Sequence, residues 1–255
     1  MNPSTTLPVG SQLRAWRQRR HLSQLDLSVD AEVSTRHLSF VETGRAMPSR
    51  EMVLRLANRL EVPLRERNRL LTAAGYAPMY AERPLSDPAL QAARDAVELV
   101  LKGHEPYPAL AIDRHWNLVS YNRAVPALLE GVAAELLQPP LNVLRLSLHP
   151  GGLAPRIVNL GQWRAHLLRD LAVQAEATGD EELKTLYDEL RAYPGPEGEP
   201  GEHEVFVPLE IDGLTFLSTR TAFTTALDVT VSELAIESFF PANEHTAQAI
   251  QDASR

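Results

Sequence analysis

The chain has 255 residues, no cysteine and a formal net charge of −8. The lack of cysteine excludes disulfides, thiolate metal sites and cysteine nucleophiles. The length and the 44% hydrophobic residues suit two globular domains. No apolar run approaches the ~18–20 residues of a membrane-spanning helix, so we expect no membrane partner. The segment MNPSTTLPVG lacks the features of a signal peptide, so we expect the protein to stay in the cytoplasm.

The charge is distributed unevenly along the chain. Residues 1–80 contain 12 arginines and 7 acidic residues, a net charge of +5, whereas the remaining 175 residues carry −13. Such asymmetry is typical of a chain in which one domain alone contacts phosphates. We therefore expect only the first domain to bind DNA.

The first predicted helix covers residues 11–20. Leu13 and Trp16 are three residues apart and define its buried side. Its arginines, Arg17 among them, are expected to point mostly outward.

The next segment, residues 22–49, has the turn signals of a helix-turn-helix. Ser23 and Ser34 can each cap the start of a helix, residues 31–33 supply the tight turn between the two helices, and Gly44 ends the second one. The register of this segment resembles the repressor-like family of prokaryotic helix-turn-helix regulators. That resemblance implies a second helix that is presented to double-stranded DNA.

Residues on the two sides of this second helix have different predicted roles. Leu38 and Val41 face the core, so the side chains opposite them can reach base edges, while polar residues near helix starts and in the following loop can contact phosphates. A five-helix domain that binds nothing would show similar apolar spacing, and each polar residue alone could be a solvated surface group. The predicted DNA-binding residues are Gln24, Ser34, Thr35, Arg36, Ser39, Arg45 and Arg50.

Two further helices complete the predicted first domain. Ser49 can cap a fourth helix that runs to Leu60, and residues 64–74 form a fifth helix that Gly75 ends. The proline-rich passage 77–88 cannot continue a helix and marks the boundary. We predict a helix-turn-helix domain over residues 1–80, a linker and connecting helix over 81–103, and a ligand-binding domain over 104–255.

The second domain is predicted to mix helices and strands. The expected elements are a helix over 88–101, strands over 109–113 and 116–120, a helix capped by Asn122, helices through 133–193, and strands over 205–211, 214–223 and 234–240. Asp212–Gly213 is a strong hairpin signal, and residues 194–201 are interpreted as a mobile surface loop.

Two strands, then helices, then three strands is the order of a PAS-like domain, in which an antiparallel sheet folds around helices and often leaves a pocket. The expected fold class is therefore α+β and mainly helical. It combines an N-terminal five-helix repressor-like helix-turn-helix domain with a C-terminal PAS-like α/β domain that contains an antiparallel sheet.

Polar residues interrupt apolar segments of the second domain and are the candidates for ligand contact. A fatty acid needs an apolar tunnel for its tail and an arginine, aided by Asn, His or Tyr, for its carboxylate. Arg145 and Arg156 are the predicted carboxylate partners, although ion pairing and helix capping would explain them equally well. The full predicted ligand set is Arg145, His149, Arg156, Asn159, Asn142, Tyr107 and Trp116.

Nearly the whole chain resembles one family, the MmyB-like regulators. The resemblance is carried by VPLRERNRLLTAAGYAP at 62–78, HEPYPALAIDRHWNLVSYN at 104–122, LNVLRLSLHPGGLAPRIVNLGQWRAHLL at 141–168, a strand at 216–221 and LAIESFFPA at 234–242. It implies a transcription factor whose second domain holds a fatty acid or a similar lipophilic molecule, bound non-covalently, with no other cofactor required. We expect the protein to act as a homodimer on DNA.

Two alternatives concern the second domain. It could serve dimerisation or protein interaction without a ligand, or, more remotely, be a lipid-modifying hydrolase. No G-x-x-x-x-G-K-[ST], H-E-x-x-H or G-x-S-x-G motif occurs, and the eight histidines lack ligand spacing. The sequence therefore predicts neither catalytic residues nor a metal site.

Overall fold

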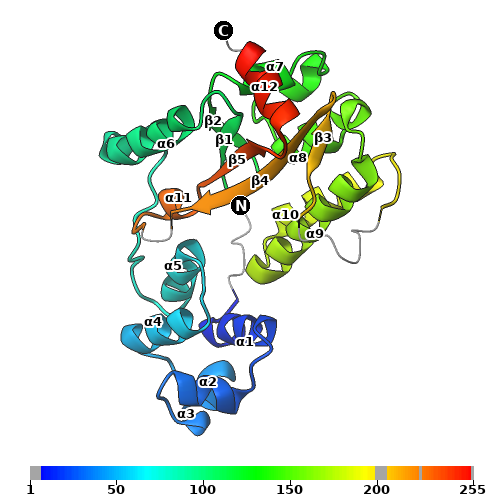
Figure 1. Cartoon of the computed structure of the whole chain (residues 1–255). Coiled ribbons are helices and arrows are strands. Elements are labelled where there is room, and N and C mark those ends of the chain that lie inside the picture. Colours follow the sequence, from blue (N-terminus) through cyan, green and yellow to red (C-terminus); the bar gives the residue numbers. More distant parts are fainter. Residues whose placement is uncertain (1–6, 199–205, 224–225, 254–255) are drawn as a thin grey trace. The chain divides into compact units, whose positions relative to one another are not determined.

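The computed structural model describes residues 7–198, 206–223 and 226–253 (Figure 1). The chain divides into two compact units. The first comprises residues 1–83 with the short segments 176–179 and 226–229, and the second comprises the rest of the chain. No helix in the described ranges is long and apolar enough to span a membrane.

The first unit contains the five predicted helices. They are α1 (Val9–Arg19), α2 (Gln24–Asp30), α3 (Thr35–Glu42), α4 (Arg50–Arg59) and α5 (Leu64–Ala73). The first of them starts two residues earlier than predicted, directly after Pro8.

Serine caps set three of these helix starts, as predicted. The hydroxyls of Ser23, Ser34 and Ser49 each accept a hydrogen bond from the backbone N–H three residues later, at 3.1, 3.2 and 3.2 Å. The carboxylate of Asp26 accepts in return from the N–H of Ser23, which completes a capping box.

The turn between α2 and α3 needs a left-handed residue, and here that residue is not glycine. Glu32 has φ +54°, and the N–H of Val33 donates to the carbonyl of Ser28 at 2.9 Å. At the end of α3 the same role falls to Gly44, with φ +73°, and at the end of α5 to Gly75. The predicted turn positions are confirmed.

One apolar core holds the five helices together. Leu13 and Trp16 of α1 pack with Leu38 of α3, Leu56 of α4 and further buried side chains. The axis of α1 passes so close to the end of α3 that a Cβ on Gly10 would lie 2.0 Å from the carbonyl oxygen of Val41.

The second unit has helices on both sides of one sheet. Its helices are η1 (Pro88–Leu90), α6 (Gln91–Gly103), α7 (Val125–Leu128), η2 (Ala134–Leu137), α8 (Val143–Leu148), η3 (Ala154–Arg156), α9 (Leu160–Thr178), α10 (Glu181–Ala192), α11 (Val229–Ser232) and α12 (Glu244–Ala253). Its strands are β1 (Ala109–Ile112), β2 (Leu118–Tyr121), β3 (Leu209–Ile211), β4 (Leu214–Ala222) and β5 (Ala235–Pro241). Two of these helices are divided between the units, because residues 176–178 of α9 and Val229 of α11 are assigned to the first unit.

The five strands form an antiparallel sheet of order β2-β1-β5-β4-β3. Asp212 and Gly213, with φ +51° and +77°, form the predicted hairpin between β3 and β4. Two strands, then helices, then three strands is the order that the sequence predicted. The protein is thus α+β, with a helical N-terminal unit and a five-stranded sheet in the C-terminal unit.

The two sheet faces are covered by different helices. Val97 and Leu101 of α6 pack on Ala109, Ala111 and Ile236 on one face. The other face packs against α8, α9 and α10, through buried side chains that include Leu144, Trp163, Leu171, Leu186, Leu209 and Phe216.

Several expectations about the second unit require correction. The second strand starts at Leu118 and not at Trp116, because Trp116 has φ +67° and belongs to the turn. In the third strand, Val205 lies outside the described residues and Val207 is not in the strand. The C-terminal helix α12 was not predicted.

The prediction that Asn122 caps the next helix is also wrong, because that helix starts at Val125 and its N-cap residue is Ala124. The buried Asn122 accepts from the N–H groups of Ala109 and Ala124 and donates to the carbonyls of Leu101 and Tyr107. It therefore joins the end of α6 to the first strand.

Of the loop predicted at 194–201, residues 199–201 lie outside the described residues. Residues 194–198 contain neither helix nor strand.

Candidate DNA interface and ligand cavity

The exposed face of α3 carries the residues that are suited to meet DNA. Arg36 is exposed and lies over the ring of Phe40, with 5.4 Å from its guanidinium carbon to the ring centroid. Arg45, exposed in the loop after the helix, approaches the same ring at 6.0 Å. Ser39 is half-buried one turn after Arg36. These positions form one polar surface around Phe40.

Other predicted DNA-binding residues make internal bonds. The hydroxyl of Thr35 lies 2.8 Å from that of Ser28. Gln24 donates to Oε2 of Glu42 at 2.8 Å. Ser34 caps α3, and Arg50 is exposed at the first turn of α4. The side chains of Thr35 and Gln24 thus also fix the helix-turn-helix.

The arrangement of α1 and α3 depends on a buried ion pair that the sequence did not suggest. Arg17, expected to point outward, is 9% exposed and donates to both oxygens of Glu42 at 2.7 and 2.9 Å. Burial alone would raise the pKa of Glu42, but hydrogen bonds from Arg17 and Gln24 outweigh it and hold that pKa below its usual value.

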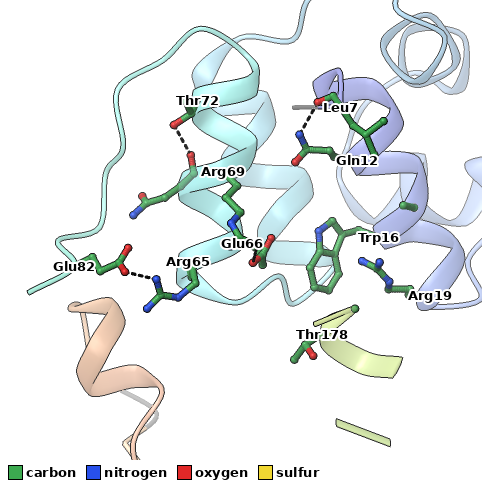
Figure 2. A pocket seen from close by; sticks show the side chains of 13 residues that line it. Leu7, Gln12, Trp16, Arg19, Arg65, Glu66, Arg69, Thr72, Glu82 and Thr178 are labelled. Atoms are coloured by element: carbon green, nitrogen blue, oxygen red, sulfur yellow. Dashed lines mark hydrogen bonds and ion pairs between the residues drawn. The ribbon is translucent and has the colours of Figure 1, made fainter. Parts of the chain in front are cut away.

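The first unit has a hollow beside α1 and α5 (Figure 2). Its walls are polar: Arg65 pairs with Glu82, and Arg69 with Glu66 at 2.6 Å. Charged walls of this kind do not suit a lipophilic ligand.

The second unit contains an apolar cavity of about 280 Å³ between the sheet and the helices that cover it. Its walls are mostly leucine and other apolar side chains: Leu110, Trp116, Leu118, Val125, Leu128, Leu129, Val143, Leu144, Leu146, Leu153, Trp163, Leu167, Leu209 and Phe239. The polar lining residues are Ser147, His166, Asp170, Ser218, Arg220 and Glu237. An apolar hollow with a few polar groups is typical of a small-molecule site.

One face of α9 supplies two of the polar groups. Trp163, His166, Leu167 and Asp170 follow one another at helical spacing and all line the cavity. His166 Nδ1 lies 3.9 Å from Asp170 Oδ1. In the sequence, His166 and Asp170 stand at helical spacing among apolar residues, which indicates a polar site on this face, but neither residue was predicted to contact a ligand.

The sheet supplies the other charged pair. Arg220 of β4 and Glu237 of β5 are directly opposite each other, and Arg220 Nε donates to Glu237 Oε1. The guanidinium carbon of Arg220 lies 4.0 Å from the ring centroid of Trp116. Burial raises the pKa of Glu237, and Asp170 adds to this effect, while Arg220 opposes it.

Trp116 is held in an unusual backbone conformation at the wall of the cavity. Its φ of +67° is rare for a bulky residue. The carboxylate of Asp113 accepts from the N–H groups of His115 and Asn117 on either side, and the carbonyl of Trp116 accepts from Val143 at 2.9 Å. The turn thereby directs the indole under Arg220.

The predicted carboxylate partners are engaged elsewhere. Arg145 makes two hydrogen bonds of 2.7 Å with Glu189. Arg156 pairs with Asp212 and donates to the carbonyls of Leu128 and Glu130. Neither arginine lines the apolar cavity.

The other predicted ligand residues are likewise separate from this cavity, with one exception. Asn142 caps α8, and Asn159 bridges Pro208 and Glu210. His149 Nδ1 accepts from the N–H of Gly151. Of the seven predicted residues, all within the described ranges, Trp116 alone lines the cavity, while Tyr107 and the others do not.

One cluster brings together side chains that can ligate metals. His115 lies between Asp180, at 3.0 Å, and Glu182, at 2.8 Å. Asp180 also caps α10 and pairs with Arg114 at 3.3 Å. These internal bonds account for the cluster without a metal ion.

Comparison with known proteins covers both units. Residues 8–70 match the family model of a helix-turn-helix domain, and residues 93–253 match that of the MmyB-like transcription regulator ligand binding domain. No curated protein matches the chain. Because the second match alone spans more than half of the chain, the protein belongs to the MmyB-like transcription regulators, with a DNA-binding helix-turn-helix domain followed by a ligand-binding domain.

Proposed function

We propose that this regulator binds a specific DNA operator and that a lipophilic small molecule in the cavity of about 280 Å³ changes its DNA affinity. The observation that carries the proposal is the leucine-lined cavity, which lies inside the part of the chain that matches a ligand-binding family. A fatty acid is the ligand that the family resemblance implies, and other small lipophilic molecules suit the same walls. We propose that the protein acts in the cytoplasm, where it can reach DNA.

The sheet supports a PAS-like interpretation of the second domain. Helices lie between the second and third strands in the sequence, and the sheet and α8 and α9 enclose the cavity. We therefore propose that the second domain is PAS-like.

Coupling between ligand and DNA requires that the ligand bind two arrangements of the protein unequally. We propose a homodimer in which ligand occupancy biases the placement of the two helix-turn-helix domains on a two-fold operator. Half-sites about one helical turn apart, roughly 34 Å, would suit such a dimer.

Native mass spectrometry of the purified protein, before and after denaturation, tests for the ligand. A small lipophilic mass that leaves on unfolding supports the proposal. An operator selected from random DNA is then titrated with the ligand-free and the ligand-loaded protein. A change of about 5- to 150-fold in affinity is expected for allosteric coupling, and equal affinities would contradict it.

Two other roles for the second domain predict different results. A dimerisation or protein-interaction module would show no ligand and no effect of added lipid on operator affinity. A lipid-modifying hydrolase needs a nucleophile beside a base. The cavity has two serines, Ser147 and Ser218, and one histidine, His166. Ser147 accepts a hydrogen bond from Trp163 Nε1 at 2.9 Å, and among the described residues no hydrogen bond joins either serine to His166. We therefore propose no catalytic activity.

A further inference from the structure

Arg220 lies at the rim of the leucine-lined cavity and has hydrogen-bond donors that the protein does not use. Its side chain is 37% exposed, whereas Leu144 and Trp163, which line the same cavity, are buried. Its Nε donates to Glu237 Oε1, and within the described ranges neither Nη1 nor Nη2 makes a hydrogen bond to another residue. The two Nη groups at the end of the guanidinium are therefore available to a ligand.

The guanidinium is held in place from two sides. Its central carbon lies 4.0 Å from the ring centroid of Trp116, so the indole covers one of its faces. The buried Glu237, directly opposite on β5, fixes Nε. A guanidinium that is already oriented loses little side-chain freedom when it binds a ligand, which favours affinity.

A carboxylate is the polar group that fits these donors best. Its two oxygens can accept from Nη1 and Nη2 in parallel, and both hydrogen bonds are charge-assisted, whereas an alcohol offers one neutral oxygen. At the rim, a carboxylate keeps contact with water and avoids much of the cost of burying a charge. The apolar chain of the same ligand would occupy the space lined by Leu144, Leu167 and Leu209.

Two acidic residues, Glu237 and Asp170, also line the cavity and bear on the binding of an anion. His166 Nδ1 lies 3.9 Å from Asp170 Oδ1. Burial raises the pKa of Glu237, and an anion bound to Arg220 would raise this pKa further. Glu237 can therefore take up a proton when the negative charge of the ligand enters, which would relieve the repulsion between the two carboxyl groups.

We propose that Arg220 binds the carboxylate of a lipophilic acid through Nη1 and Nη2, and that Trp116 and Glu237 position its guanidinium. The inference rests on the proposed ligand-binding function and adds the residue that selects the polar end of the ligand. Arg220 thus takes the role that the sequence assigned to Arg145 and Arg156, neither of which lines the cavity.

The test compares two probes that share an eight-carbon chain, octanoate and octanol. Any co-purified lipid is first removed from the full-length protein on a hydrophobic resin. Calorimetric titration at pH 7, below the concentration at which octanoate forms micelles, then measures each affinity. We expect octanoate to bind at least about tenfold more tightly than octanol, a factor that corresponds to ~1.4 kcal/mol.

Variants of Arg220 assign the contact. Arg220→Gln should lower octanoate affinity about tenfold, to the level of octanol, and leave octanol affinity unchanged. Arg220→Lys keeps the charge without the planar fork and should recover part of the loss. It also carries the test if Arg220→Gln fails to fold by circular dichroism. Arg169→Gln is the matched control, because it removes an equal, exposed charge on α9 that does not line the cavity, and it should change neither affinity.

Glu237→Gln tests the positioning role. The amide keeps an oxygen that can accept from Arg220 Nε and removes the negative charge beside the ligand. We therefore expect octanoate affinity to rise and octanol affinity to stay the same. A fall in octanoate affinity in the folded variant would overturn the role assigned to Glu237.

The outcomes separate this inference from the proposed function. Octanoate binding no tighter than that of octanol overturns the carboxylate contact and leaves a lipophilic site intact. Equal losses of both probes in folded Arg220→Gln, or an equal loss of octanoate in Arg169→Gln, overturn it as well. Failure of both probes to bind the wild type overturns the cavity as a lipophilic site, and with it the ligand half of the proposed function.

Discussion

Arg17 and Glu42 are joined by two hydrogen bonds, from Nε to Oε1 at 2.7 Å and from Nη2 to Oε2 at 2.9 Å. The pair fixes α1 to the last turn of α3, and Gln24 adds α2 to the same carboxylate at 2.8 Å. Three helices of the DNA-binding unit therefore meet at one buried charge. The orientation of α3, which carries Arg36, depends on this network as well as on the apolar core.

Replacing Glu42 tests the network. Glu42→Gln leaves the buried guanidinium of Arg17 without its charge partner, and breaking a buried pair in this way costs about 3–5 kcal/mol. Urea unfolding of the full-length protein measures the loss. Glu51→Gln is the control, because its pair with Arg55 is exposed and spans 3.3 Å, so its cost should stay below ~0.5 kcal/mol. Similar losses for the two variants would show that the buried pair adds no special stability.

The same pair predicts a dependence of stability on pH. The pKa of Glu42 is held below its ordinary value of 4.5 in the folded state. Its contribution is therefore fully present above pH 4.5 and is lost as the pH falls through the lower folded-state pKa. The free energy of unfolding of the wild type should approach that of Glu42→Gln as the pH falls below 4.5. A difference that stays constant between pH 7 and pH 3 would contradict this assignment.

The sequence predicted the first unit well because its signals are local. Ser23, Ser34 and Ser49 act within three residues of themselves, and Gly44 acts through its own backbone. The direction of Arg17 could not be predicted in this way. Its partner lies 25 residues away, and helical spacing alone does not reveal it.

The sequence predicted a pocket in the second domain, but it did not predict most of the residues that line the cavity. Arg220 and Glu237 become neighbours only through the register of β4 with β5, which the pattern of apolar residues does not fix. Arg145 was predicted to bind a ligand carboxylate because it is a charged residue in a leucine-rich segment, yet it is paired with Glu189 on another helix. A polar residue in an apolar segment thus indicates a partner, and only the fold shows whether that partner is protein or ligand.

Gly10 should be intolerant of any side chain. A Cβ at this position would lie 2.0 Å from the carbonyl oxygen of Val41, and a backbone atom cannot move aside as a flexible side chain can. We expect Gly10→Ala to lower the free energy of unfolding by about 1–3 kcal/mol or more. Gly103→Ala is the control, because nothing lies within 4 Å of its added Cβ. Wild-type stability of Gly10→Ala would show that α1 can shift along α3 at little cost.

Arg145 is expected to stabilise the fold without contributing to ligand binding. Its pKa is raised and that of Glu189 lowered by their two-point hydrogen bond, while Tyr193 donates to the same carboxylate at 2.5 Å. A double-mutant cycle of Arg145→Ala with Glu189→Ala should give a coupling of about 1 kcal/mol, since both side chains are partly solvent-exposed. The affinity for octanoate, a short fatty-acid probe, should not change in folded Arg145→Ala. A selective loss of octanoate binding would restore Arg145 as a carboxylate partner.

The last prediction concerns contact with DNA. Arg36 is exposed on α3, so Arg36→Ala should weaken operator binding about tenfold or more, by ~1–3 kcal/mol if the arginine reads a base. Titrations at several salt concentrations separate the two kinds of contact. A phosphate contact lowers the slope of log affinity against log salt by about 0.9, whereas a base contact leaves the slope unchanged and reduces discrimination between operator and random DNA. Arg59→Ala, which removes an equal exposed charge from the last turn of α4, is the matched control. If both variants weaken binding equally and shift the slope equally, the basic charge of the unit as a whole attracts DNA and Arg36 has no specific place in recognition.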